Sequence, residues 1–315
     1  MNVLITGSKG FVGINLSNAL RLKYKNIFFL ERNINEYSSN VITYDDLTVD
    51  FLNQNNINVI IHLAGKAHDT KNVEIAEDYY LINFGLTKKI FDIFKKSNTN
   101  RFIYISSVKA SSDQVLNILE EDHPPKPATH YGKSKLMAEN YILLNSSQDK
   151  KFFILRPSMI HGPGNKGNLN FLYNFVLKNK FWPLASFKNK RSLCSVGNFC
   201  FVIDEILSNN KIESGIYNIA DDDPISTNEI VMLIARSLKI KIFYYKFPKI
   251  FINALGHFGD LLHLNFNTEK LVKLTENYLV SNKKITNAIG KKLPLSTIDG
   301  LLITFDWLTN NKKNN

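Results

Sequence analysis

The stretch Val3-Leu4-Ile5-Thr6-Gly7-Ser8-Lys9-Gly10-Phe11-Val12-Gly13 decides the fold of this chain. It joins an apolar run to three glycines spaced three residues apart, and a helix-like pattern follows. Glycines allow the backbone to approach a pyrophosphate, and the N-terminus of the next helix faces the anion. The stretch therefore predicts the strand, turn and helix that open a dinucleotide-binding unit.

Apolar runs alternate with helix-like segments through the first half, a pattern typical of a parallel sheet with crossover helices. The run Val59-Ile60-Ile61 is apolar on both faces, as a buried parallel strand should be. The expected strands are 2–6, 26–30, 41–44, 58–63, 101–106 and 151–155, and the expected helices are 11–23, 75–96 and 131–145.

After Arg156-Pro157 the rhythm changes to a cluster of Gly, Pro and Asn and then to short elements with aromatic patches. A further strand is expected at 215–220, a helix at 227–238, and short amphipathic helices after residue 247. The fold predicted is α/β, with a Rossmann-type doubly wound parallel sheet. Residues 1–160 are expected to form the dinucleotide-binding domain. Residues 161–315 are expected to form mainly a smaller α/β substrate lobe, interleaved with the last strands of the sheet.

Composition excludes some functional classes. The 315 residues are 44% hydrophobic and 21% charged, which is ordinary for a soluble globular protein. No apolar stretch reaches the roughly 18 residues of a membrane span, so a cytoplasmic protein is expected. The net charge is +11, but only six of the 39 basic residues are arginine and the lysines are scattered, which disfavours a nucleic-acid partner. Cys194 and Cys200 lack metal-ligand spacing, so no metal site is predicted.

The stretch Tyr131-Gly132-Lys133-Ser134-Lys135 places a phenol and an ammonium four residues apart, on one face of a helix. A nearby cation favours the phenolate, so Lys135 is expected to lower the pKa of Tyr131. Tyr131 is therefore predicted to exchange protons at neutral pH.

Two residues after the second expected strand give opposite signals about the cofactor. Glu31 would accept hydrogen bonds from the adenosine ribose and repel a 2′-phosphate, which favours NAD. Arg32 could pair with that phosphate, which favours NADP. Both cofactors stay open, and NAD is slightly favoured.

Several further motifs are spread over nearly the whole chain. They are His62-Leu63-Ala64-Gly65, Asn83, Ile105-Ser106-Ser107, Leu155-Arg156-Pro157, Gly162-Pro163-Gly164, Arg191-Ser192 and Tyr217-Asn218-Ile219-Ala220. With the glycine turn and Tyr131…Lys135, they resemble the extended short-chain dehydrogenase/reductase superfamily. Within it, the chain is similar to the NAD-dependent nucleotide-sugar epimerases and reductases of the UDP-glucose 4-epimerase type.

This resemblance implies roles for individual residues. Ser107 would hold the substrate oxygen, with Ser106 as its rival that faces the cofactor, and Tyr131 and Lys135 would complete the catalytic set. The implied cofactor-binding residues are Gly7, Lys9, Gly10, Phe11, Val12, Glu31, Arg32, Asp46, Leu47, Leu63, Ala64, Gly65, Asn83, Ser106, Tyr131, Lys135 and Pro157. The implied substrate-binding residues are His68, Ser107, Lys109, Asn168 and Arg191, the last two as ligands of the diphosphate.

The resemblance also implies a reaction. Nucleotide-sugar 4,6-dehydratases carry an Asp-Glu pair where this chain has Val108-Lys109, and a lysine cannot protonate a leaving hydroxyl as a carboxylic acid would. The expected function is a 4-epimerase of a UDP-hexose or UDP-N-acetylhexosamine. The alternatives are an NADPH-dependent reductase of a UDP-4-keto-6-deoxy-hexose(amine) and a non-catalytic dinucleotide sensor. A homodimer through helices 75–96 and 131–145 is expected as well.

Overall fold

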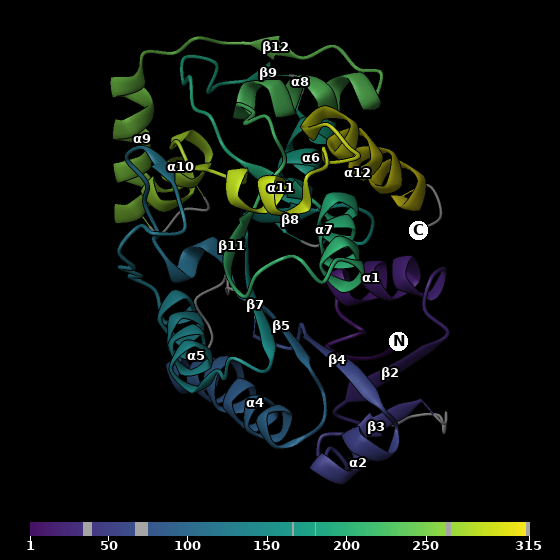
Figure 1. Ribbon diagram of the computed structural model, residues 1–315. Coiled ribbons are helices and arrows are strands. Elements are labelled where there is room, and N and C mark those ends of the chain that lie inside the picture. The colour runs from purple at the N-terminus through teal and green to yellow at the C-terminus, as the bar shows by residue number, and fades with distance from the viewer. Residues whose placement is uncertain (34–39, 67–74, 166, 180, 263–265, 313–315) are drawn as a thin grey trace.

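A computed structural model describes residues 1–33, 40–66, 75–165, 167–179, 181–262 and 266–312 (Figure 1). Within these ranges, seven parallel strands form one sheet in the order β11-β7-β5-β4-β1-β2-β3. The strand order reverses between β1 and β4, so this is the doubly wound arrangement predicted from the sequence. The strands are β1 (Asn2–Thr6), β2 (Asn26–Glu31), β3 (Val41–Thr43), β4 (Ile57–His62), β5 (Arg101–Ile105), β7 (Lys151–Pro157) and β11 (Gly215–Ile219).

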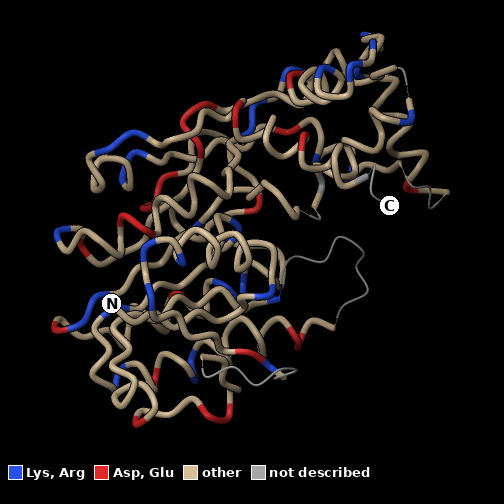
Figure 2. The backbone as a smooth tube through the Cα atoms, turned by 90° about the vertical axis from the view of Figure 1, so that its right-hand side faces the viewer, with Lys and Arg blue, Asp and Glu red and all other residues tan. Residues whose placement is uncertain are grey.

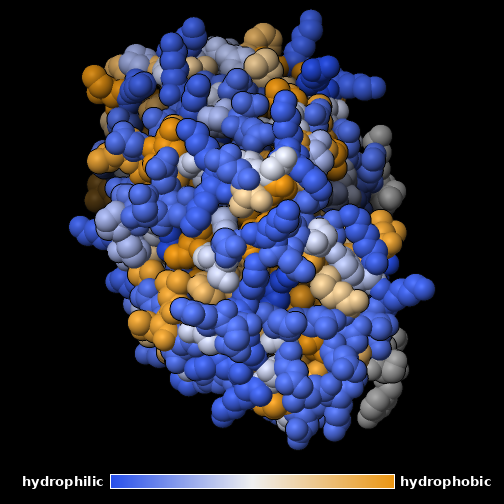
Figure 3. Space-filling model, viewed as in Figure 1, coloured by the Kyte–Doolittle hydropathy of each residue, from blue (hydrophilic) through white to orange (hydrophobic). Residues whose placement is uncertain are grey.

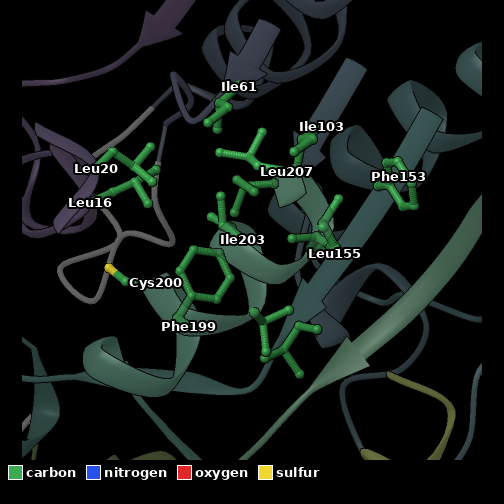
Figure 4. Close-up of a cluster of buried hydrophobic side chains, with 14 of the residues drawn as sticks. Leu16, Leu20, Ile61, Ile103, Phe153, Leu155, Phe199, Cys200, Ile203 and Leu207 are labelled. Carbon is green, nitrogen blue, oxygen red and sulfur yellow. The ribbon is translucent and has the colours of Figure 1, made fainter. Parts of the chain in front are cut away.

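Alternate residues of each strand enter two different cores, because side chains alternate across a sheet. Val3 and Ile5 of β1 pack with α1 (Phe11–Arg21) and α7 (Val196–Ser208) on one face. Figure 4 shows Leu16 and Leu20 of α1 near Ile203 and Leu207 of α7 in this core. Leu4 enters the opposite core with α2 (Val49–Gln54), α4 (Leu86–Lys96) and α5 (His130–Asn145).

The helix predicted over 75–96 is helical throughout but not uniform. It consists of α3 (Ala76–Tyr79), a π-helical turn η1 (Tyr80–Gly85) and α4. The hydroxyl of Thr87 donates to the carbonyl of Asn83 at 2.7 Å. Asn83 itself lies within this π-helical turn, and such irregularities often occur at functional sites. The other expected helices and strands are confirmed, with ends shifted by at most two residues.

The second half forms a separate core of its own. Tyr173, Trp182 and Phe305 are buried there among the helices of this half. Those helices are α6 (Asn168–Lys178), α8 (Thr227–Ser237), α9 (Lys249–Leu261), α10 (Thr268–Thr275) and α12 (Thr297–Lys312), whereas α11 (Lys283–Ile289) packs in the core of the large sheet. The remaining elements are short: η2 (Val108–Ala110), β6 (Ile118–Leu119), β8 (Met159–His161), β9 (Phe181–Trp182), β10 (Leu193–Ser195), β12 (Phe243–Tyr244) and β13 (Leu279–Val280).

Residues 193–219 return to the large sheet, since α7 covers it and β11 pairs with β7. The division at residue 160 stays a prediction. Lysine and arginine occur in both halves, interleaved with acidic residues (Figure 2). Among the described helices, none is both long and apolar enough to cross a bilayer.

Candidate active site

The glycine turn brings β1, α1 and the end of β4 into close contact. Gly7 has φ +71°, and a Cβ there would lie 2.8 Å from the Ala64 nitrogen. A Cβ on Gly13 would overlap the Gly7 carbonyl oxygen. Gly10, the N-cap of α1, supplies no capping side chain, so the first N–H groups of α1 are left for an anion.

A cavity of about 440 Å³ lies beside this turn. Eight residues predicted to bind the cofactor line it: Gly7, Lys9, Gly10, Glu31, Arg32, Leu63, Ala64 and Gly65. Six further lining residues were not predicted: Ser8, Leu30, Asn33, Tyr44, Ile82 and Leu86. Ile82 and Leu86 belong to η1 and α4, so only the tertiary fold brings them here.

The two residues with opposite cofactor signals both reach this cavity. The Ser8 hydroxyl donates to the Glu31 carboxylate at 3.1 Å, and the exposed Lys9 forms an ion pair with it. Lys9 and Glu31 therefore pair with each other at the edge of the cavity that both line. Arg32 also lines the cavity, so the positions of Glu31 and Arg32 do not decide between NAD and NADP.

The structure does not bring Asp46 and Leu47 into the cavity. The Asp46 carboxylate accepts hydrogen bonds from the Thr43 nitrogen at 3.1 Å and the Thr43 hydroxyl at 2.5 Å, and these bonds lower the pKa of Asp46. Leu47 is buried in the core beside α4. The local turn satisfies the aspartate, and Tyr44 from the same loop lines the cavity instead.

Seven other predicted residues lie outside this lining: Phe11, Val12, Asn83, Ser106, Tyr131, Lys135 and Pro157. The Phe11 ring lies against Gly162 and Gly164, and Val12 packs on the core under the sheet. Pro157 ends β7, where it is paired with Ile219 of β11. The Ser106 hydroxyl donates to the buried carboxylate of Glu139, so its side chain does not face the cofactor cavity as expected.

A buried chain of hydrogen bonds connects the end of β1 with η1. The Ala64 nitrogen donates to the Thr6 hydroxyl at 2.9 Å, and Thr6 bonds to Nδ1 of His62 at 2.8 Å. Nε2 of His62 bonds to the Thr87 hydroxyl at 2.9 Å. Burial, together with the charge of Lys135, lowers the pKa of His62 to about 3. The ring is therefore neutral: Nδ1 accepts from Thr6, and Nε2 donates to Thr87, which donates onward to Asn83.

Asn83 fixes the backbone at the end of β4. Its amide oxygen accepts from the Lys66 nitrogen at 2.8 Å, and its amide nitrogen donates to the Ser134 hydroxyl at 3.0 Å. A Cβ on Gly65 would lie 2.9 Å from that amide oxygen and 3.0 Å from Nζ of Lys135. Gly65 therefore leaves the space in which the asparagine and the lysine meet.

Lys135 is almost completely buried. Its ammonium donates to the Ile105 carbonyl at 2.9 Å and lies 4.9 Å from the Tyr104 ring centroid. Burial lowers the pKa of Lys135 to about 8, and the Glu139 carboxylate opposes that shift. Glu139 is held in turn by Arg156, whose Nε and Nη2 donate to it at 3.0 and 2.6 Å.

Tyr131 lies one turn before Lys135 and is hydrogen-bonded to Ser107. The first turn of α5 lies close to Lys109 and Pro127, and this requires glycine at position 132. A Cβ there would overlap the Lys109 carbonyl and lie 2.9 Å from Pro127. Burial raises the pKa of Tyr131, and the Ser107 hydrogen bond offsets only part of the increase. The expected lowering by Lys135 is not found. The lysine is turned to the Ile105 carbonyl, and desolvation of the phenolate dominates.

Lys109 and Arg191 meet beside this pair. Nζ of Lys109 donates to the Asp113 carbonyl at 2.8 Å and lies 4.5 Å from the Tyr278 ring centroid. The Arg191 guanidinium donates to the Lys273 carbonyl of α10. Burial lowers the pKa of Lys109; Asp113 and Glu276 oppose that shift, and the charges of Arg191 and Lys273 add to it. Near Ser107, Lys109 and Arg191 each lie beside a carboxylate, Asp113 at 3.8 Å and Glu276 at 3.9 Å. His68 and the side chain of Asn168 lie outside the described part.

Replacing Lys135 tests the electrostatic cost of its burial. The folded-state pKa of about 8 lies below the reference 10.5, so the unfolded chain binds this proton more strongly between those values. The stability of the wild type should therefore rise relative to Lys135→Met by about 3 kcal/mol as pH rises from 7 to 10.5. Urea denaturation at several pH values measures this. The exposed Lys133→Met on the same helix should give a flat difference. An equally flat difference for Lys135→Met would contradict the prediction.

Comparison with known proteins agrees with this geometry. The model of the NAD dependent epimerase/dehydratase family matches residues 3–220. A UDP-glucose 4-epimerase of Vibrio cholerae is 31% identical over 79% of this chain and 82% of its own length. An N-acetyl-alpha-D-glucosaminyl-diphospho-ditrans,octacis-undecaprenol 4-epimerase of Escherichia coli O157:H7 is 28% identical over 76% of this chain and 73% of its own.

Solved structures show the same fold at lower identity. The UDP-glucuronic acid 4-epimerase from Bacillus cereus in complex with NAD superposes with a TM-score of 0.76 at 18% identity, covering 100% of this chain and 99% of that one. The UDP-N-acetylglucosamine 4-epimerase from the same organism gives a TM-score of 0.76 at 19% identity, covering 98% and 99%. With its family match spanning well over half of the chain, this protein belongs to the NAD dependent epimerase/dehydratase family.

Proposed function

We propose that the protein is an NAD-dependent 4-epimerase of a nucleotide-sugar, with a UDP-linked hexose or N-acetylhexosamine as substrate. The observation that carries this proposal is the hydrogen-bonded pair Ser107–Tyr131, next to Lys135, beside the cavity of the glycine turn. The 4-epimerase relative from Vibrio cholerae supports the same reaction.

The residues present fit a dinucleotide. Gly7 and Gly10 would let the backbone and the N-terminus of α1 hold the pyrophosphate. Glu31 would accept from the adenosine ribose, and Lys135, next to Gly65, would donate to the nicotinamide ribose. A bound NAD would supply hydride transfer from the sugar carbon and back to it. Because the hydride returns to the sugar, the bound cofactor would be regenerated in each turnover, and no cofactor would have to be added.

The chain's own residues handle the proton and the sugar oxygen. Ser107 and Tyr131 would hold the 4-oxygen of the sugar between two hydroxyl groups. Tyr131, in its phenolate form, would take the proton of that oxygen as the hydride leaves, and would return it to the same oxygen at the end. Donors that point at the oxygen stabilise the charge that develops on it in the transition state. Lys109 and Arg191 would face the diphosphate of the substrate.

A second candidate is reduction of a 4-keto-6-deoxy nucleotide-sugar by NADPH. The observation that favours it is the position of Arg32 in the cavity, where a guanidinium could pair with a 2′-phosphate. In this reaction Ser107, Tyr131 and Lys135 would act only in the reduction of the 4-keto group.

The bound nucleotide distinguishes the two candidates. Freshly purified protein, denatured by heat, should release NAD in an amount close to one molecule per chain, identified by mass. It should then epimerise a UDP-sugar without added cofactor. Protein that releases no dinucleotide and consumes NADPH only in the presence of a keto-sugar would reverse the order of the candidates.

Removal of single hydroxyl groups tests the catalytic pair. Tyr131→Phe and Ser107→Ala should each lower kcat by a factor on the order of 10² to 10⁴, because general acid–base and oxyanion groups contribute that much. Released NAD should stay unchanged. Tyr141→Phe is the matched control, since that phenol lies on the same helix but donates to Asp92. Turnover of Tyr131→Phe equal to that of the control would exclude the proposed role.

We further propose that the protein is a homodimer, formed through the helical segment 76–96 and α5. Leu81 of η1 and Met137 and Leu144 of α5 are exposed apolar side chains on these elements. Light scattering should give twice the mass of one chain, and Leu81→Asp/Leu144→Asp should reduce it to a single chain. A single-chain mass for the wild type would contradict this arrangement.

A further inference from the structure

Helix α9 buries its small residues and exposes its large ones, the reverse of an ordinary helix in a globular protein. Ile252, Gly256 and Gly259 are its buried residues. A Cβ on Gly259 would overlap the Phe266 carbonyl, and one on Gly256 would lie 3.3 Å from Leu271 of α10. The glycines therefore let α9 lie close against α10, and the core receives only one large side chain from this helix.

The exposed side of α9 is continuously apolar. At 100° per residue, Ile250, Phe258, Phe251 and Leu255 fall within an arc of about 140°. Ile250 is 82% exposed and Leu261, in the same arc, is 75% exposed. Figure 3 shows hydrophobic residues along the upper left edge, where Figure 1 places α9. We define the α9 surface by its exposed apolar residues Tyr245, Phe247, Ile250, Phe251, Leu255, Phe258, Leu261 and Leu262.

This surface is large for a soluble protein. Its eight side chains expose an area on the order of 1,000 Å², whereas the largest patch of a typical monomer is about 300–600 Å². Within it, Tyr245 stacks on Phe247 at a centroid distance of 5.9 Å.

The charges around this surface are almost all positive. Residues 239–262 contain four lysines and one acidic residue, Asp260. The lysines are exposed and are Lys239, Lys241, Lys246 and Lys249. One of these lysines, Lys249, is the first residue of α9, and Lys246 precedes it. An apolar helix face accompanied by lysines is typical of helices that lie in a membrane interface. A second copy of this chain would bring like charges together, whereas anionic lipids complement them.

We propose that the α9 surface docks on an anionic phospholipid bilayer. Phe251, Phe258 and their neighbours enter the boundary between headgroups and acyl chains, and the lysines contact the lipid phosphates. Helix α9 then lies in the plane of the interface rather than across the membrane. The binding is peripheral and decreases with salt, because the lysine contribution is screened.

Helix α10 separates the α9 surface from the proposed site, because it packs on the glycine side of α9, opposite the exposed face, and carries the Lys273 carbonyl that accepts from Arg191. Docking of the α9 surface therefore does not rest on the proposed function.

Vesicle sedimentation tests the proposal with the full chain. The wild type should sediment with vesicles of phosphatidylcholine and phosphatidylglycerol, and much less with phosphatidylcholine alone. Phe251→Ser/Phe258→Ser should lower the partition coefficient at least tenfold. Leu22→Ser, which removes an apolar side chain that is 88% exposed at the end of α1, is the matched control and should bind like the wild type. Thermal melting establishes that each variant is folded.

Charge reversal gives an independent measurement. Lys246→Glu/Lys249→Glu should weaken binding and flatten its salt dependence, whereas the exposed pair Lys25→Glu/Lys211→Glu should do so much less. Absence of vesicle binding by the wild type, or equal binding by Phe251→Ser/Phe258→Ser, would overturn the proposal. A mass that falls on Phe251→Ser/Phe258→Ser, with no vesicle binding by the wild type, would assign the surface to a second copy. Neither measurement requires turnover, so failure of the proposed function would leave it intact.

Discussion

The site depends on the buried hydrogen-bonded chain that joins Thr6, His62, Thr87 and Asn83. It ties the end of β1 to the end of β4 and then to the π-turn that carries Asn83. Each group in the chain has one donor and one acceptor role, so the neutral His62 can adopt only one tautomer there. The chain ends next to Lys135, and it therefore couples the position of the glycine turn to the position of this lysine.

The electrostatics of α5 serve function at the expense of stability. A lysine that donates to Ile105 in a buried position loses hydration, and its lowered pKa measures that loss. The Glu139 carboxylate, which Arg156 holds in place, supplies a compensating negative charge one turn further along the helix. A buried pair of this kind is itself costly to desolvate, so it is better understood as holding the lysine charged than as stabilising the fold. Strain of this sort is expected at sites built for chemistry.

The sequence predicted what depends on local pattern. The turn Gly7–Gly13, the alternation of strands and helices, and the pair Tyr131 and Lys135 are set by spacing along the chain, and the structure contains all of them. Glu139 and Tyr44 were missed because their roles arise from segments far apart in sequence. Asp46 was assigned to the cofactor, but a hydroxyl three residues away satisfies its carboxylate more directly. Proximity in sequence to a motif does not decide where a side chain points.

Helix α9 is a second case in which the sequence pattern alone does not decide where side chains lie. Its apolar periodicity would suit a core helix, and periodicity alone cannot say which of two apolar faces is buried. The glycines at 256 and 259 decide this, because only the face without side chains can approach α10 so closely. The large residues are thereby left outside, next to lysines. Placing the glycines on the outer face instead would bury the aromatic residues and separate the two helices. The exposed apolar face is therefore a direct consequence of how α9 and α10 pack.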